Sequence, residues 1–372
     1  MARLPWPWTP GNPDNLPMNR FIKHLGIPVC IILVMPLLGL VFNQKPWQPF
    51  LAFPPKTSMV SRAPFSLIIF IFIALFIATA TLPLIKKGMA YQSRKKPSFT
   101  SPFPWWGFSS LFSLIFFWVL AWTRFEWFSM FQAHTFFPLW FSLIVFINSL
   151  VYRATGQCPL VNSGYKFYLL FAVSAVFWWV FEYLNRFVSN WYYTGSQYSA
   201  LKYFFLASIS FSTVLPAVES MKALVLTFDC FTYGFKTCRP MGWIDAKPFS
   251  FAIIIASVLS LFFVGLFPDQ LFFTIWISPF LLILGCHILS GQTHVCSSLK
   301  TGDFTRVAAY ASAALVCGFF WELFNLYSLS RWQYSIPYVQ ALHLFEMPLL
   351  GYAGYLPFGL ECALVIDLIF DD

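Results

Sequence analysis

Ten runs of about 20 mostly apolar residues occupy most of this 372-residue chain. A run of that length is what an α-helix needs to cross the hydrocarbon layer of a bilayer. Only 10% of the residues are charged, against about 25% in a typical soluble domain, so most of the surface must face lipid. The sequence therefore predicts an all-α polytopic transmembrane helix bundle of about ten spans. The predicted spans are 25–42, 65–85, 105–122, 136–152, 167–187, 203–226, 249–267, 270–290, 306–327 and 341–369.

The two ends of this series of spans have features of their own. The start of the chain lacks the short apolar region and small-residue cleavage site of a removable signal peptide, so the first run is interpreted as a signal anchor. The last run is long and contains Pro348 and Pro357. Proline interrupts helical hydrogen bonding, and non-helical backbone at membrane depth is tolerated only where protein buries it. We therefore expect the last span to be broken or re-entrant.

Lysine and arginine lie mainly in the short loops between the apolar runs, although the net charge is +9. Alternate loops, beginning with the side that holds the N-terminus, carry most of them, which by the positive-inside rule predicts that both termini are cytoplasmic. This distribution favours the lipid bilayer as the partner and not nucleic acid. The basic, polar segment from Lys86 to Pro104 separates two N-terminal spans from the rest, so the first predicted domain is 1–104.

The remainder of the chain contains an internal similarity at an offset near 140 residues. Phe181-Glu182-Tyr183-Leu184-Asn185 matches Trp321-Glu322-Leu323-Phe324-Asn325, and each is followed by a Trp-x-Tyr, at 191–193 and 332–334. Pro216 to Glu219 then matches Pro357 to Glu361, each within a predicted span. Four spans separate equivalent helices, and this even number predicts a parallel duplication of a four-helix unit. The predicted repeats are 105–227 and 249–370.

Carboxylates inside apolar spans are costly, and they are functional-site candidates by default. The candidates for catalysis are Glu182, Glu322, Glu219 and Glu361, with Asn185 and Asn325 three residues after a glutamate and therefore on the same helical face. Each asparagine could orient its glutamate by a hydrogen bond. The candidates for substrate binding are Trp179, Trp191, Tyr193, Trp321, Trp332, Tyr334 and Glu346.

A purely structural interpretation of the same residues stays open. Buried Glu and Asn side chains can tie helices together through interhelical hydrogen bonds. Arg186 follows the first motif and could pair with Glu182, which would make that site structural. His287 and His294 lie near Cys286 and Cys296, but their spacing matches no closed zinc site, so neither a metal nor a cofactor is predicted.

The repeated motif resembles the lycopene cyclase domain of carotenoid biosynthesis. The similarity is carried by Trp321-Glu322, Trp332-Gln333-Tyr334 and Pro357-x-x-x-Glu361, and by their counterparts in the first repeat, about 50 residues in each. Single glutamates stand where that family has an adjacent pair. The chain also resembles uncharacterised bacterial membrane proteins with Phe-Trp-Glu-x-x-Asn and Phe-Glu-Met-Pro motifs. These resemblances imply a protein of the bacterial inner membrane that acts on an isoprenoid.

Three functions remain compatible with the sequence. The first is acid-catalysed, cyclase-like conversion of an isoprenoid or other long apolar lipid, which requires a proton donor, aromatic faces for a carbocation and a pocket that excludes water. The second is a transporter or lipid-binding protein with a carboxylate relay, and the third is a structural or assembly subunit. If the protein is an enzyme, we expect an enclosed apolar pocket with glutamates on its wall. If it is a transporter, we expect a polar path open to one side, and if it is a structural subunit, we expect no cavity.

Overall fold

The structure is a computed structural model that describes residues 17–91, 99–195 and 197–370. Within these ranges, nine helical segments are long and apolar enough to cross a membrane, and a shorter apolar one spans Thr274–Leu289. The chain is therefore a helical, multi-pass membrane protein, as the apolar runs predicted. The start of the predicted domain 1–104 and the centre of its basic segment, with Arg94, Lys95 and Lys96, lie outside the described residues. The predicted domain boundaries remain a prediction.

Most of the helices coincide with the predicted runs, whereas the predicted span 270–290 is only a shorter helix and the four short strands were not predicted. The N-terminal part contributes α1 (Pro17–Phe42), η1 (Gln48–Leu51) and α2 (Leu67–Ala90). The middle contributes α3 (Trp105–Trp122), η2 (Glu126–Phe128), η3 (Gln132–His134), α4 (Phe136–Thr155), α5 (Pro159–Asn162), α6 (Tyr165–Val188), β1 (Trp191–Thr194), α7 (Ala200–Phe211), α8 (Val214–Val225) and α9 (Asp229–Gly234). The C-terminal part contributes α10 (Lys247–Val264), η4 (Thr274–Trp276), α11 (Ser278–Leu289), η5 (Ser297–Thr301), α12 (Thr305–Asn325), β2 (Arg331–Tyr334), β3 (His343–Leu344), β4 (Met347–Pro348), η6 (Leu349–Gly354) and α13 (Tyr355–Phe370).

Two of the spans are interrupted close to a proline. The helix that begins at Ala200 breaks between α7 and α8, just before Pro216. The last predicted run is divided into the β3–β4 hairpin, η6 and α13, with Pro357 in the first turn of α13. The expectation that the last span is broken is confirmed. The α7–α8 break lies among buried residues, as irregular backbone at this depth requires. In the last run, β3 is exposed and β4 is buried.

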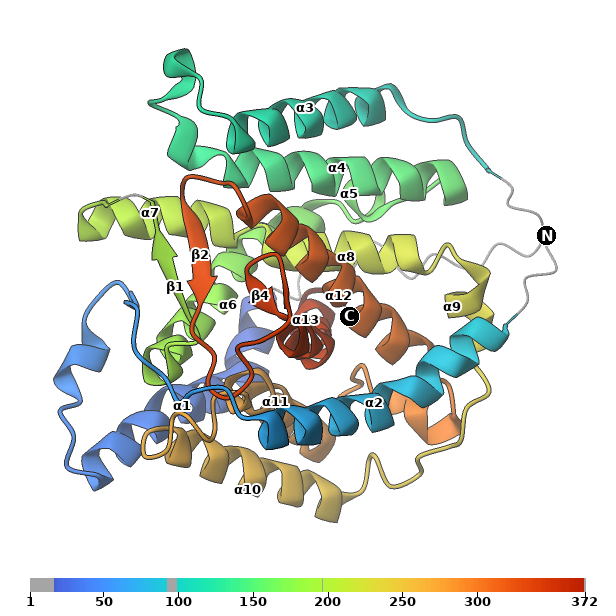
Figure 1. The fold of residues 1–372 in the computed structure, drawn as a ribbon. Coiled ribbons are helices and arrows are strands. Elements are labelled where there is room, and N and C mark those ends of the chain that lie inside the picture. Colours follow the sequence, from blue (N-terminus) through green and yellow to red (C-terminus); the bar gives the residue numbers. More distant parts are fainter. Residues whose placement is uncertain (1–16, 92–98, 196, 371–372) are drawn as a thin grey trace.

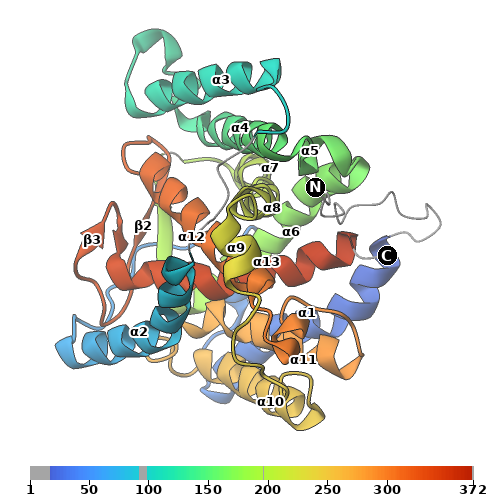
Figure 2. The same cartoon turned by 90° about the vertical axis from the view of Figure 1, so that its right-hand side faces the viewer.

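The centre of the bundle is formed by α6, α8, α12 and α13, and α13 is almost completely buried. In Figure 2, α12 and α13 lie between a layer that contains α3 and α4 and a layer that contains α1, α10 and α11. Helices α12 and α13 approach closely because Gly359 has no side chain. A Cβ added there would lie 2.3 Å from the carbonyl oxygen of Tyr310.

Strands β1 and β2 form a small antiparallel sheet at one end of the bundle (Figure 1). Each strand follows a central helix, β1 after α6 and β2 after α12. In the register, Trp191 lies opposite Tyr334 and Tyr193 lies opposite Trp332. Because side chains alternate along a strand, these four aromatic residues share one face of the sheet. Extended segments so far apart in sequence are thereby brought together above the central helices.

Helix α2 stands at the outside of the bundle, and none of its residues is buried (Figures 1 and 2). The Ser66 hydroxyl caps its N-terminus by accepting from the backbone N–H of Ile69. The N–H of Ser66 also donates to the carbonyl of Tyr338. At the other end Lys87 donates to the carbonyl of Thr237 over 3.0 Å. The helix is therefore held at both ends and contacts little protein along its length.

Candidate functional site

The carboxylate of Glu182 is fully buried and accepts three hydrogen bonds on a single oxygen. Its Oε1 accepts from Nε1 of Trp178 at 3.0 Å, from Nε1 of Trp191 at 3.0 Å and from the hydroxyl of Tyr193 at 2.7 Å. Its Oε2 has no hydrogen-bond partner among the described residues. Helix α6 provides the carboxylate and Trp178, while β1 returns over the helix end and provides Trp191 and Tyr193.

The carboxylate of Glu322 is held in the same way in the second half of the chain. Its Oε1 lies 3.2 Å from Nε1 of Trp332, 2.6 Å from the hydroxyl of Tyr334 and 3.1 Å from the hydroxyl of Tyr355, all of which donate to it. Its Oε2 also lacks a hydrogen-bond partner within the described part of the chain. The two glutamates with the six Trp and Tyr donors are called the carboxylate–aromatic clusters below.

The third donor differs between the two clusters. In the first it is Trp178, one helical turn before Glu182 on α6. The corresponding position before Glu322 is Gly318, and a Cβ added there would lie 2.3 Å from ring atoms of Tyr355. The absence of a side chain at Gly318 therefore makes room for the ring of Tyr355, which reaches Glu322 from α13.

The two asparagines do not contact the glutamates that they were expected to orient. Asn185 donates to the carbonyl of Trp191 at 2.7 Å and accepts from its N–H at 3.3 Å. Asn325 donates to the carbonyl of Trp332 at 2.8 Å and accepts from its N–H at 2.9 Å. The expected Glu–Asn pairs are wrong, because the chain after each helix turns back and offers its backbone to the amide. Each asparagine fixes the start of a strand, and the strand brings the ring donors to the carboxylate.

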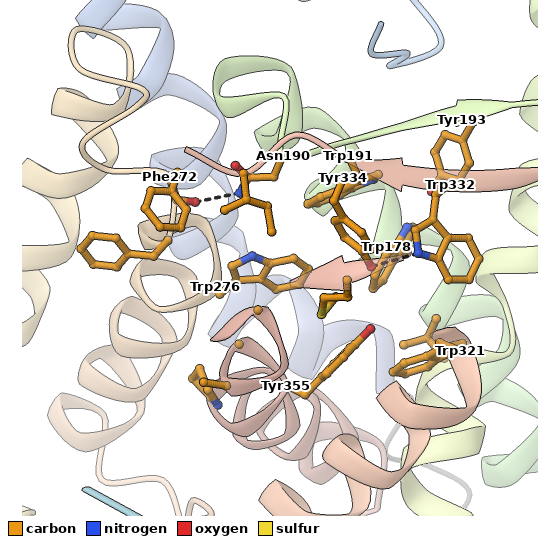
Figure 3. A pocket seen from close by; sticks show the side chains of 18 of the residues that line it. Trp178, Asn190, Trp191, Tyr193, Phe272, Trp276, Trp321, Trp332, Tyr334 and Tyr355 are labelled. Carbon is orange, nitrogen blue, oxygen red and sulfur yellow. Dashed lines mark hydrogen bonds between the residues drawn. The ribbon is translucent and has the colours of Figure 1, made fainter. Parts of the chain in front are cut away.

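A cavity of about 990 Å³ lies beside the two clusters. Its lining is mainly apolar and rich in aromatic rings (Figure 3). Among the predicted substrate-binding residues, Trp191, Tyr193, Trp321, Trp332 and Tyr334 line it. Glu182 and Glu322 do not line it, so the carboxylates lie behind the aromatic wall and not on it.

The cavity extends beneath the β1–β2 sheet from one side of the bundle to the other. On one side its walls come from the start of α4 and from α7, including Phe137, Leu206 and Ile209. On the other side they come from α2, α11 and η6, including Phe76 and Leu281. In Figure 2 α7 lies above β2 and α2 lies below it. Helix α2 thus covers one lateral side of an elongated cavity.

The polar atoms of the aromatic wall face the clusters. Burial and the neighbouring Glu182 raise the pKa of Tyr193 well above its usual value. Burial and Glu322 do the same to the pKa of Tyr334. Both phenols are therefore neutral hydrogen-bond donors across the physiological pH range.

Arg186 does not neutralise Glu182 by a direct ion pair. Its guanidinium donates to the carbonyls of Phe50, Ala52 and Pro54 in the segment between α1 and α2. Thr57 in the same segment donates to the carbonyl of Trp191 over 2.7 Å. These bonds anchor the segment against β1, next to the cavity.

Glu219 and Glu361 lie apart from the clusters. Glu219 is buried on α8, where it forms an ion pair with Lys222 at 2.7 Å and accepts from the hydroxyl of Tyr310 at 2.9 Å. Glu361 is buried on α13, and its Oε2 lacks a partner among the described residues. Neither lines the cavity, so the structure does not bring all four candidate glutamates to one site.

Two of the predicted substrate-binding residues lie away from the cavity. Trp179 donates to the hydroxyl of Ser208 at 2.9 Å and does not line the cavity, in contrast to its neighbour Trp178. Glu346 lies in the turn between β3 and β4, 3.8 Å from Arg331, and is also absent from the lining.

The described residues contain no group of three or more His, Cys, Asp or Glu side chains placed to hold a metal ion. His294 instead lies 3.3 Å from Asp245, and the ring of His287 lies edge-on to that of His24.

Sequence reasoning missed two residues that shape the site. Trp276 lines the cavity and packs against both Phe181 and Trp191, with ring centroids 5.2 and 5.4 Å away. Tyr355 lines the cavity and donates to Glu322. The glycine one turn before Glu322 was the only signal for Tyr355, since it marks a place where another helix can approach.

Comparison with protein-family models, with curated proteins and with solved structures finds no match for this chain.

Proposed function

We propose that this protein binds a long apolar molecule, of the isoprenoid or a similar lipid class, in the cavity beneath the β1–β2 sheet. One observation carries the proposal. The indole N–H and phenol O–H groups of the wall are bonded to two buried carboxylates. Because these polar atoms already have partners, the rings can present apolar faces to a ligand without leaving a buried donor unsatisfied.

The size and shape of the cavity support a long ligand. A volume of about 990 Å³ lies at the upper end of the range for ligand sites, about 300–1,000 Å³. The lining runs from α4 and α7 to α2 and α11, so the space is elongated. Its position among membrane-spanning helices allows a lipid-soluble molecule to reach it from the bilayer.

We also propose that the core is duplicated and that the site lies between its two halves. The order of elements is similar from α3 and from α10 onwards: an apolar helix, a second apolar helix, a short helix, a central helix, a strand and a broken span. In the β1–β2 register, the Trp of each Trp-x-Tyr lies opposite the Tyr of the other: Trp191 opposite Tyr334, and Trp332 opposite Tyr193. This is the register that a two-fold relation would produce, and binding sites often lie at such repeat interfaces.

Acid-catalysed conversion of the bound molecule is the second candidate function. It is favoured by the unpartnered Oε2 of Glu182 and Glu322 and by the short bonds from Tyr193 and Tyr334. In this reaction the tyrosine hydroxyl would turn from the glutamate to the ligand and give its proton to a carbon–carbon double bond, while its oxygen takes the proton of the protonated carboxyl. The aromatic wall could stabilise the resulting carbocation. Return of a proton from the ligand to the same relay would complete a cyclisation that needs no cofactor and gives an isomer of the substrate.

Binding is tested by filling the cavity. Ala207 lines it on α7, and Ala207→Phe would place a ring in it. Ala172→Phe on α6 is the matched control, because Ala172 is exposed and does not line the cavity. A dibrominated octadecanol quenches tryptophans that it contacts. We expect saturable quenching of the wild type and of Ala172→Phe, and its loss in Ala207→Phe; equal quenching of all three would refute binding in this cavity.

Conversion is tested in a lycopene-accumulating bacterium that expresses the wild type, Glu182→Gln or Glu322→Gln. The amide keeps the shape of the side chain but cannot supply the proton. New pigments or lipids with the wild type and their loss in the variants would support acid catalysis. Profiles identical to those of an empty vector would leave only the binding function.

The other functions fit the site less well. A transporter should have a polar path, whereas this cavity is lined mainly by apolar side chains. A structural subunit should have no cavity. We also propose that the termini are cytoplasmic in a bacterial inner membrane, with Thr301 and Gln340 on opposite sides of the span formed by α12. An impermeant maleimide added to intact cells should then label Gln340→Cys and leave Thr301→Cys unlabelled.

A further inference from the structure

The two lateral sides of the cavity differ in charge. The side under α2 is lined by aliphatic and aromatic residues, with Gln270, Thr81 and Asn190 as its polar members and no charged side chain. The charged residues of the lining are Lys56 and Arg331, and both are cations. No carboxylate among the described residues lines the cavity at all.

Lys56 and Lys202 lie near the start of α7, and Arg331 lies on β2 opposite Thr194. The Lys56 ammonium lies 5.4 Å from the centroid of the Tyr203 ring, and Tyr203 is on α7. Lys202, the neighbouring residue, places its ammonium 4.9 Å from the ring centroid of Tyr198. Tyr198 lines the cavity and stacks on His134, with ring centroids 6.0 Å apart. Lys56, Lys202 and Arg331, with the rings of Tyr198 and Tyr203, are called the cationic mouth below.

The cationic mouth is only weakly neutralised by the protein. Arg331 lies 3.8 Å from Glu346, a distance at the outer limit of an ion pair, and also donates to the carbonyl of Leu326. Among the described residues, Lys56 and Lys202 form no ion pair, and each ammonium lies over an aromatic ring. Cations held over rings beside a cavity can attract an anion that sits at its mouth.

The segment that holds Lys56 is fixed in place. Thr57, the next residue, donates to the carbonyl of Trp191 and accepts from the amide of Asn185. Arg186 binds the carbonyls of the residues just before it. The segment between α1 and α2 thereby holds a lysine at one side of the cavity, and the helix that follows it covers the other side.

We propose that the ligand is amphipathic, with an anionic phosphate or carboxylate head group at the cationic mouth and an apolar chain that extends beneath the β1–β2 sheet towards α2. This inference rests on the proposed binding function and adds a head group and a direction to it. The polar end of the ligand lies where the cavity is cationic, and its apolar end lies where the lining has no charge.

The experiment compares two ligands with the same chain. Dibromo-octadecyl phosphate and dibromo-octadecanol differ only in the head group, and both quench the tryptophans of the wall. In a non-ionic detergent we expect the wild type to bind the phosphate about three- to tenfold more tightly, the range that two or three exposed ion pairs can supply. The preference should shrink as salt is added, because exposed charges are screened.

Matched variants identify the source of the preference. Lys56→Gln combined with Lys202→Gln should lower the affinity for the phosphate more than the affinity for the alcohol, and so reduce the preference to about twofold or less. Lys45→Gln combined with Lys247→Gln removes the same charge away from the cavity and should keep the preference. Dibromostearate, which has a carboxylate, separates recognition of any anion from recognition of phosphate.

The possible failures are distinguishable. Equal affinity of the wild type for phosphate and alcohol would overturn the head-group inference and leave the apolar binding site standing. A preference that survives the Lys56 and Lys202 substitutions would also overturn it. If neither ligand quenches the wild type, both the inference and the proposed function are refuted.

Discussion

Replacing Gly318 by alanine tests whether the space above this glycine positions Tyr355. The added Cβ would lie 2.3 Å from two ring atoms of Tyr355, whereas ordinary contacts lie at 3.4–4 Å. The ring must therefore move by about 1 Å or more, because overlapping atoms in a packed core cannot be accommodated otherwise. Such a movement pulls the hydroxyl away from Glu322, from which it is separated by 3.1 Å.

The expected loss of stability can be worked out from these contacts. Inserting a methyl group into a packed core costs about 1–3 kcal/mol, and loss of a hydrogen bond to a buried charged group adds about 1.5–3 kcal/mol. Replacing glycine by alanine in a helix returns about 0.5–1 kcal/mol. The net destabilisation should be about 2–4 kcal/mol, near the sum of the central values.

Gly26→Ala is the control, since Gly26 lies inside helix α1 and no atom lies within 4 Å of its added Cβ. This variant should be unchanged or stabilised by up to about 1 kcal/mol. Unfolding in a mixed-micelle detergent titration measures both changes. Adding Tyr355→Leu should restore part of the stability lost in Gly318→Ala, because the ring that causes the clash is gone. Similar stabilities for Gly318→Ala and Gly26→Ala would refute the proposed role of this glycine.

Two further predictions concern the carboxylate–aromatic clusters. Tyr334→Phe removes the 2.6 Å bond to Glu322 and should lower the free energy of unfolding by about 1.5–3 kcal/mol. The control Tyr192→Phe removes a bond to Gln333 outside the clusters and should lower it by about 1 kcal/mol or less. Equal losses in the same detergent titration would contradict the importance of the cluster. Asn325→Ala removes both bonds to the Trp332 backbone and should lower the free energy of unfolding by about 2 kcal/mol or more. Tryptophan emission should shift to the red as water reaches the strand. Unchanged emission would argue against a positioning role for this asparagine.

The sequence was sufficient for most of the spans and for the cluster residues that belong to the repeated motif, since both depend on local patterns, but not for Trp178 and Tyr355. Apolar length identifies a membrane-crossing helix without knowledge of its neighbours, and the repeated Glu and Trp-x-Tyr identified the residues that meet. The contacts of Asn185 could not be predicted in the same way. Its amide could hydrogen-bond either Glu182, about one turn earlier on the same helix, or the backbone of the strand that follows the helix. The structure shows the bond to the strand, which depends on the path of the chain after α6.

The choice between neighbouring aromatic residues was also beyond the sequence. Trp178 and Trp179 differ by about 100° around α6, and a helix that is apolar on all sides gives no indication of which face meets the cavity. Tertiary packing decides it, with Trp178 towards Glu182 and Trp179 towards Ser208. The contribution of Tyr355 from another helix was unpredictable for the same reason.

The pairing of β1 with β2 imposes an order on synthesis. Strand β1 leaves the ribosome about 140 residues before the strand that completes it. Three long apolar segments and the shorter Thr274–Leu289 are made in the interval. Until then β1 lacks its partner strand, and the sheet that covers the cavity is incomplete. In the newly made chain, the cavity therefore stays incomplete and accessible to lipid until the C-terminal segments are made. A chain truncated before β2 could insert its early helices but could not enclose a ligand.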